Sequence, residues 1–252
     1  MIFDEKTVQA YDEWLRSPAG YYIAGRKQKL ILDLLALREG ETVLDVGCGT
    51  GQFLMVFRRH GCEVAGIDPS QAMIDVARKK LGHRADLYRG DLHDLPFSDN
   101  DFDVVSIITS LEFCEDPEKV IAEAFRVARN RIVIVFINRY SPAMGHRKED
   151  PIVRHALRTF GIWEMKRLVT TAFTSMHVLW GSVIFLPFWC YPSFSVVEER
   201  IPIPRNPLGF FGACLFPVVY THHTIQHPLK SSLAVDVRNG RHVPGTAREM
   251  KR

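Results

Sequence analysis

The stretch that most constrains the fold runs from Thr42 to Gly51 and reads Thr-Val-Leu-Asp-Val-Gly-Cys-Gly-Thr-Gly. It starts with a short apolar run, which is typical of a buried parallel strand, and ends with three glycines at alternate positions. Glycines placed in this way let the backbone turn sharply and approach a ligand, because no Cβ stands in the way. The apolar residues that follow recur at helical spacing. The stretch therefore predicts a strand, loop and helix that together bind a nucleotide.

The position of the third glycine favours one class of nucleotide over another. A dinucleotide fingerprint, Gly-x-Gly-x-x-Gly, would need a glycine where the chain has Gln52, and Gly51 comes one residue too early. The loop therefore fits a single nucleoside better than a dinucleotide.

Three acidic residues follow three predicted strands at equal intervals, namely Asp45, Asp68 and Asp91. If the strands are parallel and their connections right-handed, all three lie at the carboxyl edge of the sheet, where open α/β folds bind ligands. An acid at the end of the second strand can accept both ribose hydroxyls. Any one of them could instead cap a turn, but three in register make that interpretation poor.

The rest of the chain continues the alternation of strands and helices, with Ser70 as a predicted N-cap. Residues 141–160 are polar and basic, which favours a cap or an insertion over core. The other predicted elements are a helix ending at Gly40, a helix from Ser70, strands at 102–108 and 131–137, a helix from Pro117, a helix at 163–172, and strands at 178–186 and 210–221.

One segment, from Leu168 to Val197, contains no Asp, Glu, Lys or Arg and is long enough to span a bilayer. Hydroxyl residues, Gly181 and two prolines interrupt it, so it lacks a predominantly apolar window. We interpret it as the end of a helix, an interior strand and the following loop. Its aromatic residues leave peripheral membrane contact open.

Composition limits the classes of protein that the chain can represent. At 252 residues and 46% hydrophobic content it can bury one full core, and a net charge of +3 gives no general argument for nucleic-acid binding. Five cysteines without a Cys-x-x-Cys pair indicate reduced thiols and no zinc site. The start of the chain lacks a signal peptide, so we expect a cytoplasmic protein.

The charge gathers at the end of the chain. After Gln226, six basic residues face two acidic ones. This tail has few apolar residues and no periodicity. His222, His223 and His227 lie at its start, but no acid or cysteine accompanies them, and we predict no metal site.

Together these motifs resemble the class I S-adenosylmethionine-dependent methyltransferases, and more narrowly the type 11 group related to the ubiquinone and menaquinone biosynthesis methyltransferases. The resemblance covers about residues 8 to 222 and is specific for cofactor and fold, but not for the methyl acceptor. The matching motifs are Val43-Leu-Asp-Val-Gly-Cys-Gly-Thr-Gly51, Gly66-Ile-Asp-Pro-Ser70, Gly90-Asp-Leu-His-Asp-Leu-Pro-Phe97, Phe102-Asp-Val-Val105 and Leu111-Glu-Phe-Cys-Glu-Asp-Pro117.

The resemblance implies a Rossmann-like α/β fold, with a seven-stranded, mostly parallel sheet, an antiparallel last strand and helices on both faces. It implies that Asp68 holds the ribose, that Met73 flanks the adenine, and that Asp91 and Leu92 lie at the exocyclic amine. The whole predicted set of residues that bind S-adenosyl-L-methionine is Asp45, Gly47, Cys48, Gly49, Gly51, Asp68, Pro69, Met73, Asp91, Leu92 and Thr109.

The chain departs from the group's pattern in two places. Arg129-Asn-Arg131 replaces a common Pro-Gly-Gly, a change that we expect to affect stability more than chemistry. A common Leu-Glu-His after the fourth strand is Leu-Glu-Phe here, so the histidine's task is done otherwise or is not needed.

We expect three parts: an N-terminal lid and helix over residues 1–40, the methyltransferase domain over 41–222 with a cap insertion at about 141–162, and a basic tail over 223–252. No catalytic base is assigned. The candidates for an acid or base are Tyr11, Glu112, Asn138, Tyr140 and His146, and Trp14 and Tyr22 are further candidates to line the acceptor pocket.

These observations predict methyl transfer to a small-molecule acceptor. Two alternatives remain open at this stage. In one, the acceptor is a lipophilic quinone or lipid precursor at a membrane surface, reached through the aromatic residues between Phe185 and Phe211. In the other, the chain is a non-catalytic module that binds the cofactor, or binds RNA through its tail.

Overall fold

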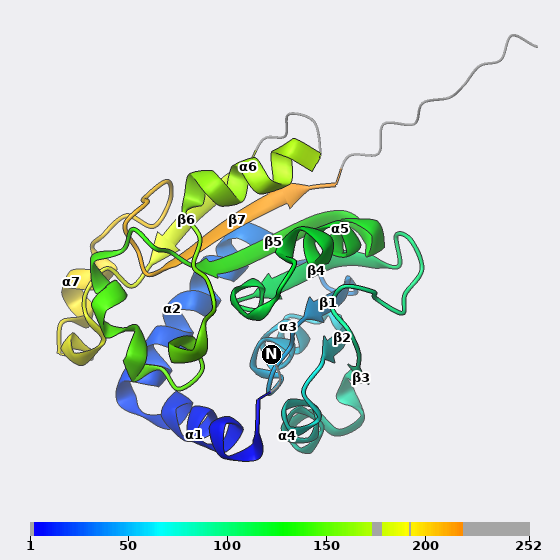
Figure 1. Ribbon diagram of the computed structural model, residues 1–252, viewed down its shortest axis with the longest axis horizontal. Helices are drawn as coiled ribbons and strands as arrows, with labels where there is room; N and C mark the ends of the chain where they lie inside the picture. Colours follow the sequence, from blue (N-terminus) through cyan, green and yellow to red (C-terminus); the bar gives the residue numbers. More distant parts are fainter. Residues whose placement is uncertain (1–2, 173–177, 192, 219–252) are drawn as a thin grey trace, which may run out of the picture. The chain divides into compact units, whose positions relative to one another are not determined.

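The computed structural model describes residues 3–172, 178–191 and 193–218, of which 146, 147 and 170–172 are described by their backbone alone. Figure 1 shows the chain, coloured along its sequence. The elements, with η for a 3-10 helix, are α1 (Glu5–Arg16), α2 (Pro18–Leu35), β1 (Thr42–Val46), α3 (Gln52–Arg59), β2 (Glu63–Asp68), α4 (Gln71–Leu81), η1 (Gly82–Arg84), β3 (Asp86–Arg89), β4 (Phe102–Ile108), η2 (Leu111–Phe113), α5 (Pro117–Val127), β5 (Ala128–Ile137), η3 (Pro142–Glu149), η4 (Val153–His155), α6 (Ile162–Ala172), β6 (Leu179–Val183), η5 (Phe188–Cys190), α7 (Ser195–Glu199) and β7 (Phe211–Pro217).

Seven strands form one sheet in the order β3-β2-β1-β4-β5-β7-β6. Strands β1 to β5 pair in parallel, whereas β7 runs antiparallel to both β5 and β6. The two central strands, β1 and β4, are apolar and buried, as expected for strands that are covered on both faces. The predicted sheet with its antiparallel last strand is confirmed.

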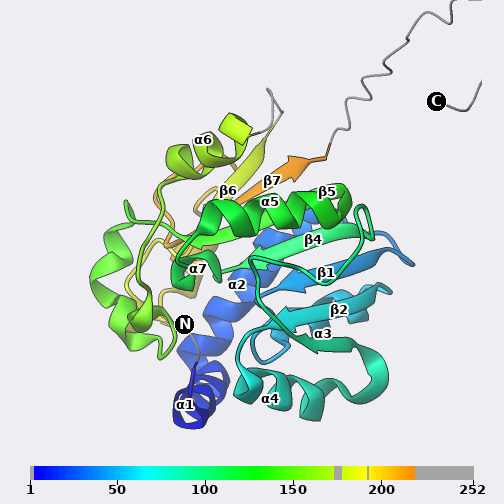
Figure 2. The same cartoon turned by 45° about the vertical axis from the view of Figure 1, so that its right-hand side comes forward.

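The helices cover both faces of the sheet, as Figures 1 and 2 show. The apolar side chains of α2, α3 and α4 pack in one core cluster, and those of α5 and α6 pack in the other. Successive side chains of a strand point to opposite faces, so Val43 belongs to the first cluster and Leu44 to the second.

Helix starts follow the capping residues in the sequence. The side chain of Ser70 accepts a hydrogen bond from Met73 N at the start of α4, and that of Asp116 accepts one from Lys119 N at the start of α5. Ser17, followed by Pro18 at the first helical position, does the same for α2. The sequence predicts a helix that ends at Gly40, whereas α2 ends at Leu35. It also misses that α2 starts at Pro18 and that α1 precedes it.

The strand predicted within the uncharged segment is correct in kind but wrong in place. It forms β6, which lies at the edge of the sheet and not in its interior. The proline-rich connection covers this edge, since Ser182 N donates to Ile203 O and Gly181 bridges to Pro204. Within the described ranges, no helix is both long and apolar enough to cross a bilayer.

Candidate functional site

The glycine loop after β1 is fixed to the end of β2 through its backbone. Gly47 N and Cys48 N both donate to Ile67 O, at 2.8 and 3.0 Å. Gly47 has a φ of +78°, and a Cβ there would lie 2.4 Å from Ser110 Oγ. Glycine is therefore required at this position for two reasons: the φ angle is positive, and the turn that follows β4 approaches too closely to leave room for a Cβ.

Two buried acids stand at this edge of the sheet. Asp45 Oδ1 accepts a hydrogen bond from Ser106 Oγ at 2.7 Å, and burial, with a smaller contribution from Asp68, raises the pKa of Asp45 to about 7. Asp68 accepts hydrogen bonds from Gly49 N at 3.0 Å and from Ser70 N at 2.9 Å. Burial raises the pKa of Asp68, and these two hydrogen bonds oppose that shift.

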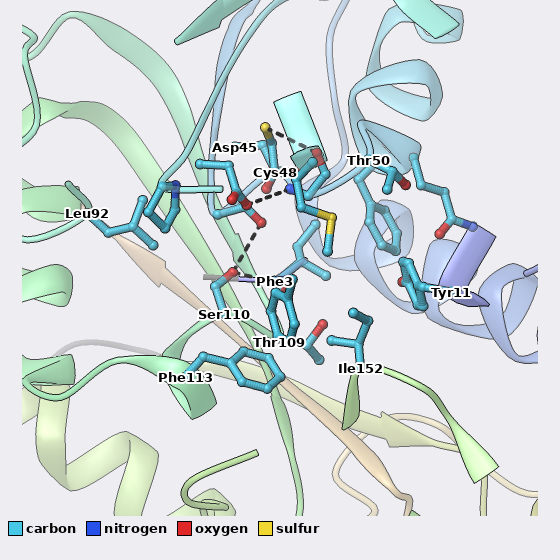
Figure 3. A pocket seen from close by; sticks show the side chains of 18 of the residues that line it. Phe3, Tyr11, Asp45, Cys48, Thr50, Leu92, Thr109, Ser110, Phe113 and Ile152 are labelled. Carbon is cyan, nitrogen blue, oxygen red and sulfur yellow. Dashed lines mark hydrogen bonds between the residues drawn. The ribbon is translucent and has the colours of Figure 1, made fainter. Parts of the chain in front are cut away.

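A pocket opens at these residues, and Figure 3 shows the side chains around it. Its walls come from β1 and its loop, the end of β2, the turn after β4, the start of the chain and the insertion after β5. The lining residues are Phe3, Tyr11, Asp45, Gly47, Cys48, Gly49, Thr50, Gln52, Phe53, Asp68, Pro69, Met73, Leu92, Ile108, Thr109, Ser110, Phe113, Cys114 and Ile152.

Two polar atoms in the pocket's wall indicate that it is built for a polar ligand. Thr50 Oγ1 and Gln52 Oε1 are buried and have no hydrogen-bond partner among the described residues. Buried polar groups normally have a partner, so these two are suited to a bound molecule. A Cβ on Gly49 would meet only Met73 Sδ, at 3.9 Å, which leaves the backbone accessible from the pocket. The residues present thus fit a nucleoside with a polar, charged extension.

Thr109, at the end of β4, has a φ of +51°, although it is β-branched. Its amide donates to Val135 O at 2.8 Å, which holds the turn in place. A β-branched residue with positive φ is a genuine outlier, and such backbone strain is concentrated at functional sites. Thr109 lines the pocket, as expected of a predicted cofactor residue.

Nine of the eleven predicted cofactor residues line the pocket, and Gly51 and Asp91 do not. Gly51 is the N-cap of α3, where a Cβ would lie 2.8 Å from Leu81 Cδ1, so its place is explained by packing. Asp91 accepts hydrogen bonds from the backbone and the ring of His93, and its side chain is two-thirds exposed.

Of the predicted acceptor-side residues whose side chains the structure describes, only Tyr11 lines the pocket. Glu112 and Asn138 are fully buried, and Asn138 Nδ2 donates to Pro207 O and Gly209 O, which is a structural role. Tyr140 is 66% exposed. The side chain of His146 lies outside what the structure describes.

The other two aromatic candidates belong to α1 and α2. Trp14 stacks on Tyr11 at 6.2 Å between ring centroids. Tyr22 stacks on Tyr191 at 4.8 Å, and its hydroxyl donates to Ser195 O, so it contacts the η5–α7 region and not the pocket.

Several lining residues are missing from the sequence prediction. Phe3 precedes the first predicted element, and its ring meets that of Phe113 edge-on at 5.2 Å. Ile152 lies in the insertion, for which the sequence predicts a cap but no particular pocket residue. Cys114, Ser110 and Phe113 follow the fourth strand directly, and that position is the signal that could have identified them.

In the described ranges, no group of three or more His, Cys, Asp or Glu is placed so that it could hold a metal ion. The residues predicted not to bind a metal, His222, His223 and His227, lie outside those ranges, as does the tail over 223–252.

Comparison with known sequences gives consistent results. A family profile described as a methyltransferase domain matches residues 44–136. The demethylmenaquinone methyltransferase of Listeria welshimeri is 30% identical over 166 residues, which cover 62% of this chain and 70% of that protein. The malonyl-[acyl-carrier protein] O-methyltransferase of Pectobacterium atrosepticum is 35% identical over 107 residues, which cover 42% of each chain. This chain thus spans less than half of the length of the latter relative.

The fold has close counterparts among solved structures. The crystal structure of an S-adenosylmethionine-dependent methyltransferase from Thermotoga maritima superposes with a TM-score of 0.66, covering 85% of this chain and 97% of that one. The two sequences are 21% identical, so the likeness concerns the fold.

Proposed function

Because the chain belongs to the class I S-adenosylmethionine-dependent methyltransferases, in the group related to the ubiquinone and menaquinone biosynthesis methyltransferases, we propose that it methylates a small-molecule acceptor in the pocket at the edge of its sheet. The observation that carries this proposal is the convergence of Asp45, the glycine loop and Asp68 on a pocket with unsatisfied polar atoms in its wall.

In this proposal the polar half of the pocket binds the cofactor. When bound, S-adenosyl-L-methionine supplies a methyl group that is electrophilic because it is attached to a sulfonium. Each carboxylate oxygen of Asp68 accepts one backbone N–H and has a further lone pair, so Asp68 can also accept the ribose hydroxyls. Met73 and Leu92 provide apolar surface for the adenine. The exposed side chain of Asp91 is assigned a weaker role, as an acceptor at the pocket's rim.

The apolar half of the pocket receives the acceptor. Its walls are Phe3 and Tyr11 from the start of the chain, Phe113 from η2 and Ile152 from the insertion after β5 (Figure 3). The chain's main contribution to the reaction is to hold the acceptor against the methyl group in an attacking geometry. We also propose that residues 1–40 and 141–162 act as the lid and the cap of this half.

A transfer assay tests the proposal. The purified chain is incubated with cofactor that carries a labelled methyl group and with a metabolite extract, and the label is followed into small products by chromatography. We expect labelled product from the intact protein and none from the Asp68→Asn variant. If calorimetry shows that the cofactor binds, but no fraction of a broad range of extracts takes up the labelled methyl group, the proposal is wrong.

A second candidate acceptor class is a lipophilic quinone or lipid precursor at a membrane surface. The observation in its favour is a group of exposed apolar side chains around α7: Trp189, Phe194, Val196 and Val197, exposed by 67, 50, 61 and 50%. Exposed apolar residues that gather in this way are typical of interaction surfaces. Four other aromatic residues of that segment, Phe188, Tyr191, Phe210 and Phe211, are buried and form core.

Liposome co-sedimentation at low salt tests the membrane candidate. We expect the protein to pellet with vesicles and the double variant Trp189→Ser, Phe194→Ser to stay in the supernatant. Equal sedimentation of the two proteins would contradict a role for this surface.

A cytoplasmic location is a further part of the proposal. It is supported by five free cysteines, all buried.

A further inference from the structure

Arg26, in α2, is buried but has no carboxylate partner among the described residues. Its exposed fraction is 8%. None of the ion pairs within 4.0 Å in the described part of the chain includes it. Charged residues are almost never buried to this extent unless they are paired, so a partner for this charge has to be found.

The guanidinium group of Arg26 uses little of its hydrogen-bonding capacity. Nη2 donates to the backbone oxygen of Glu198 at 3.5 Å, which is longer than an ordinary N–H···O bond of about 2.7 to 3.2 Å. Nε is buried without a partner among the described residues, and Nη1, which is not buried, makes no hydrogen bond to them either. Most of a planar set of donors that matches a carboxylate is therefore unused.

The carboxylate of Glu198 is occupied elsewhere, although its backbone lies beside Arg26. Glu198 Oε1 accepts a hydrogen bond from Ile184 N at 2.8 Å. Glu198 Oε2 accepts one from Phe185 N at 3.0 Å and one from the hydroxyl of Tyr191 at 2.7 Å. This acid therefore holds the segment after β6 in place and does not form an ion pair with Arg26.

Arg26 lines a groove between α2, β6 and the proline-rich connection at 201–207. The groove has a volume of about 420 Å³, within the range of about 300 to 1,000 Å³ that is typical of sites for small ligands. None of its residues lines the methyl-transfer pocket. Most of its wall is apolar, with Leu30, Leu34, Trp180, Ile201 and Ile203 among its residues.

The other charges of the groove cancel one another. Lys29 and Asp33 form an ion pair at 2.9 Å, and their side chains are 57 and 54% exposed. Glu199 and Arg200, of opposite sign, are both exposed at the end of α7. The groove thus has an excess of one positive charge, that of Arg26, which suits a ligand with a single negative charge.

We propose that this groove is a second ligand site, which binds a monocarboxylate with an apolar tail. The carboxylate accepts hydrogen bonds from the guanidinium group of Arg26, which is reached through Nη1. The tail packs against Leu34, Trp180 and Ile203. This site is independent of the proposed function, because it shares no residue with the methyl-transfer pocket.

Other ligand classes fit the groove less well. A phosphate monoester carries more negative charge than the excess positive charge of the groove. An amine would place a second cation beside Arg26. An uncharged apolar molecule would cover the groove but leave the guanidinium group without a partner, which is costly for a buried charge. A carboxylate matches the planar donor set of an arginine and carries a single charge.

Octanoate tests the inference, because it is a carboxylate on an apolar chain. Calorimetry should show saturable binding to a single site, with the same affinity in the presence and in the absence of S-adenosylhomocysteine. Octanamide, which has the same chain but no charge, and octylammonium, which has the opposite charge, should bind at least about tenfold more weakly. Octyl phosphate, which represents a lipid headgroup, should bind no more tightly than octanoate does.

Two pairs of variants test whether the carboxylate lies in this groove. Arg26→Met should weaken octanoate binding at least about tenfold, whereas Arg38→Met, which changes an exposed arginine shortly after α2, should not. Pro202 is exposed in the groove's wall, so its replacement leaves the buried Arg26 unaltered. Pro202→Glu should weaken binding by placing a negative charge beside the ligand, and Pro202→Gln, its uncharged control, should bind octanoate more tightly than Pro202→Glu does.

Four results would each overturn the inference. They are an absence of saturable octanoate binding, equal binding of octanamide, displacement of octanoate by S-adenosylhomocysteine, and equal binding of octanoate by Pro202→Glu and Pro202→Gln. Tighter binding of octyl phosphate would replace the carboxylate by a phosphate and so also contradict the inference. Binding of S-adenosylhomocysteine is measured separately in each variant, which shows whether the variant is folded and whether the proposed function fails on its own account.

Discussion

The two halves of the pocket are assembled in different ways. The cofactor half takes Asp45, Gly47 and Asp68 from two adjacent strands and the turn after the first of them. Backbone amides hold Asp68 in place, and the hydroxyl of Ser106 holds Asp45. The acceptor half takes Phe3, Phe113 and Ile152 from three segments far apart in sequence. One local motif can thus form the site for a common cofactor, whereas the site for a particular acceptor depends on how segments far apart in sequence pack together.

The largest expected effect is on the turn that joins the two halves. In Gly47→Ala a Cβ would lie 2.4 Å from Ser110 Oγ, at a φ of +78°. Ser110 has little freedom to move away, because its hydroxyl donates to Val46 O at 3.0 Å. We expect the free energy of unfolding to fall by about 4 kcal/mol, from backbone strain and overpacking together. Urea denaturation measures it.

Gly25→Ala is the matched control for this substitution. Gly25 lies inside α2, and a Cβ placed there would have no heavy atom of the surroundings within 4 Å, so alanine should raise stability by about 0.5 to 1 kcal/mol. Similar denaturation midpoints for the two variants would show that the glycine at position 47 is not required by its geometry.

Asp68→Asn should separate the cofactor half from the acceptor half. The substitution keeps the volume of the side chain but removes its charge and one acceptor oxygen. With two charge-assisted hydrogen bonds of about 1.5 kcal/mol each affected, affinity for S-adenosylhomocysteine should fall by about 100-fold. Calorimetry measures the affinity, and Asp86→Asn on the exposed β3 is the control. An unchanged affinity would remove Asp68 from the proposed site.

Two buried acids have a pKa that burial raises to about 7, namely Asp45, which lines the pocket, and Glu112, which lies outside it. The folded state holds these protons more tightly than the unfolded state does. The stabilisation is therefore complete below the unfolded pKa and is lost as pH rises through about 7. Between about pH 5 and pH 7, each acid should account for about 2 kcal/mol of lost unfolding free energy.

Asp45→Asn and Glu112→Gln test the predicted direction of this pH dependence, and they distinguish the acid that lines the pocket from the one that does not. Each substitution should flatten the decline of stability with rising pH, measured by urea denaturation at a series of pH values. Of the two, only Asp45→Asn should weaken binding of S-adenosylhomocysteine, because Asp45 lines the pocket and Glu112 does not. A decline as steep as in the unaltered protein would mean that these acids do not carry their protons in the folded state.

The same contrast explains what the sequence can and cannot predict. The first strands of the sheet and its polar edge follow from local patterns, namely an apolar run, a glycine turn and an acid at a strand end. Ser17 and Pro18 mark the start of α2 equally clearly, but the aromatic residues around them suggest a lid and not a helix. Sequence patterns within one segment are therefore sufficient where that segment alone determines the local structure.

The acceptor half cannot be predicted in this way. Glu112 is a candidate from its position, yet nothing in its neighbourhood in the sequence indicates that its side chain is fully buried and accepts a hydrogen bond from Ile137 N at the end of β5. Asn138 and Tyr140 are candidates on equal grounds. The first proves to bind the backbone at Gly209, and the second points into solvent. Burial and long-range contacts decide between such candidates, and a sequence contains neither directly.

The smallest effect is expected where the chain departs from its group's common Pro-Gly-Gly, at the sheet edge opposite the pocket. Arg129 Nη1 lies 2.7 Å from Asp103 Oδ1, but the arginine side chain is 49% exposed, so solvent screens the pair. Arg129→Ala should lower the unfolding free energy by less than about 1 kcal/mol, and the loss should shrink at high salt.

Arg131 is more firmly bound than Arg129. It makes two hydrogen bonds to the carboxylate of Glu41, at 2.8 and 2.7 Å, and donates a third to Leu35 O, so Arg131→Ala should lower the unfolding free energy by more than Arg129→Ala does. Both variants should bind S-adenosylhomocysteine as the unaltered protein does, because neither residue lines the pocket. A weakened affinity in Arg129→Ala would show that the two ends of the sheet are coupled.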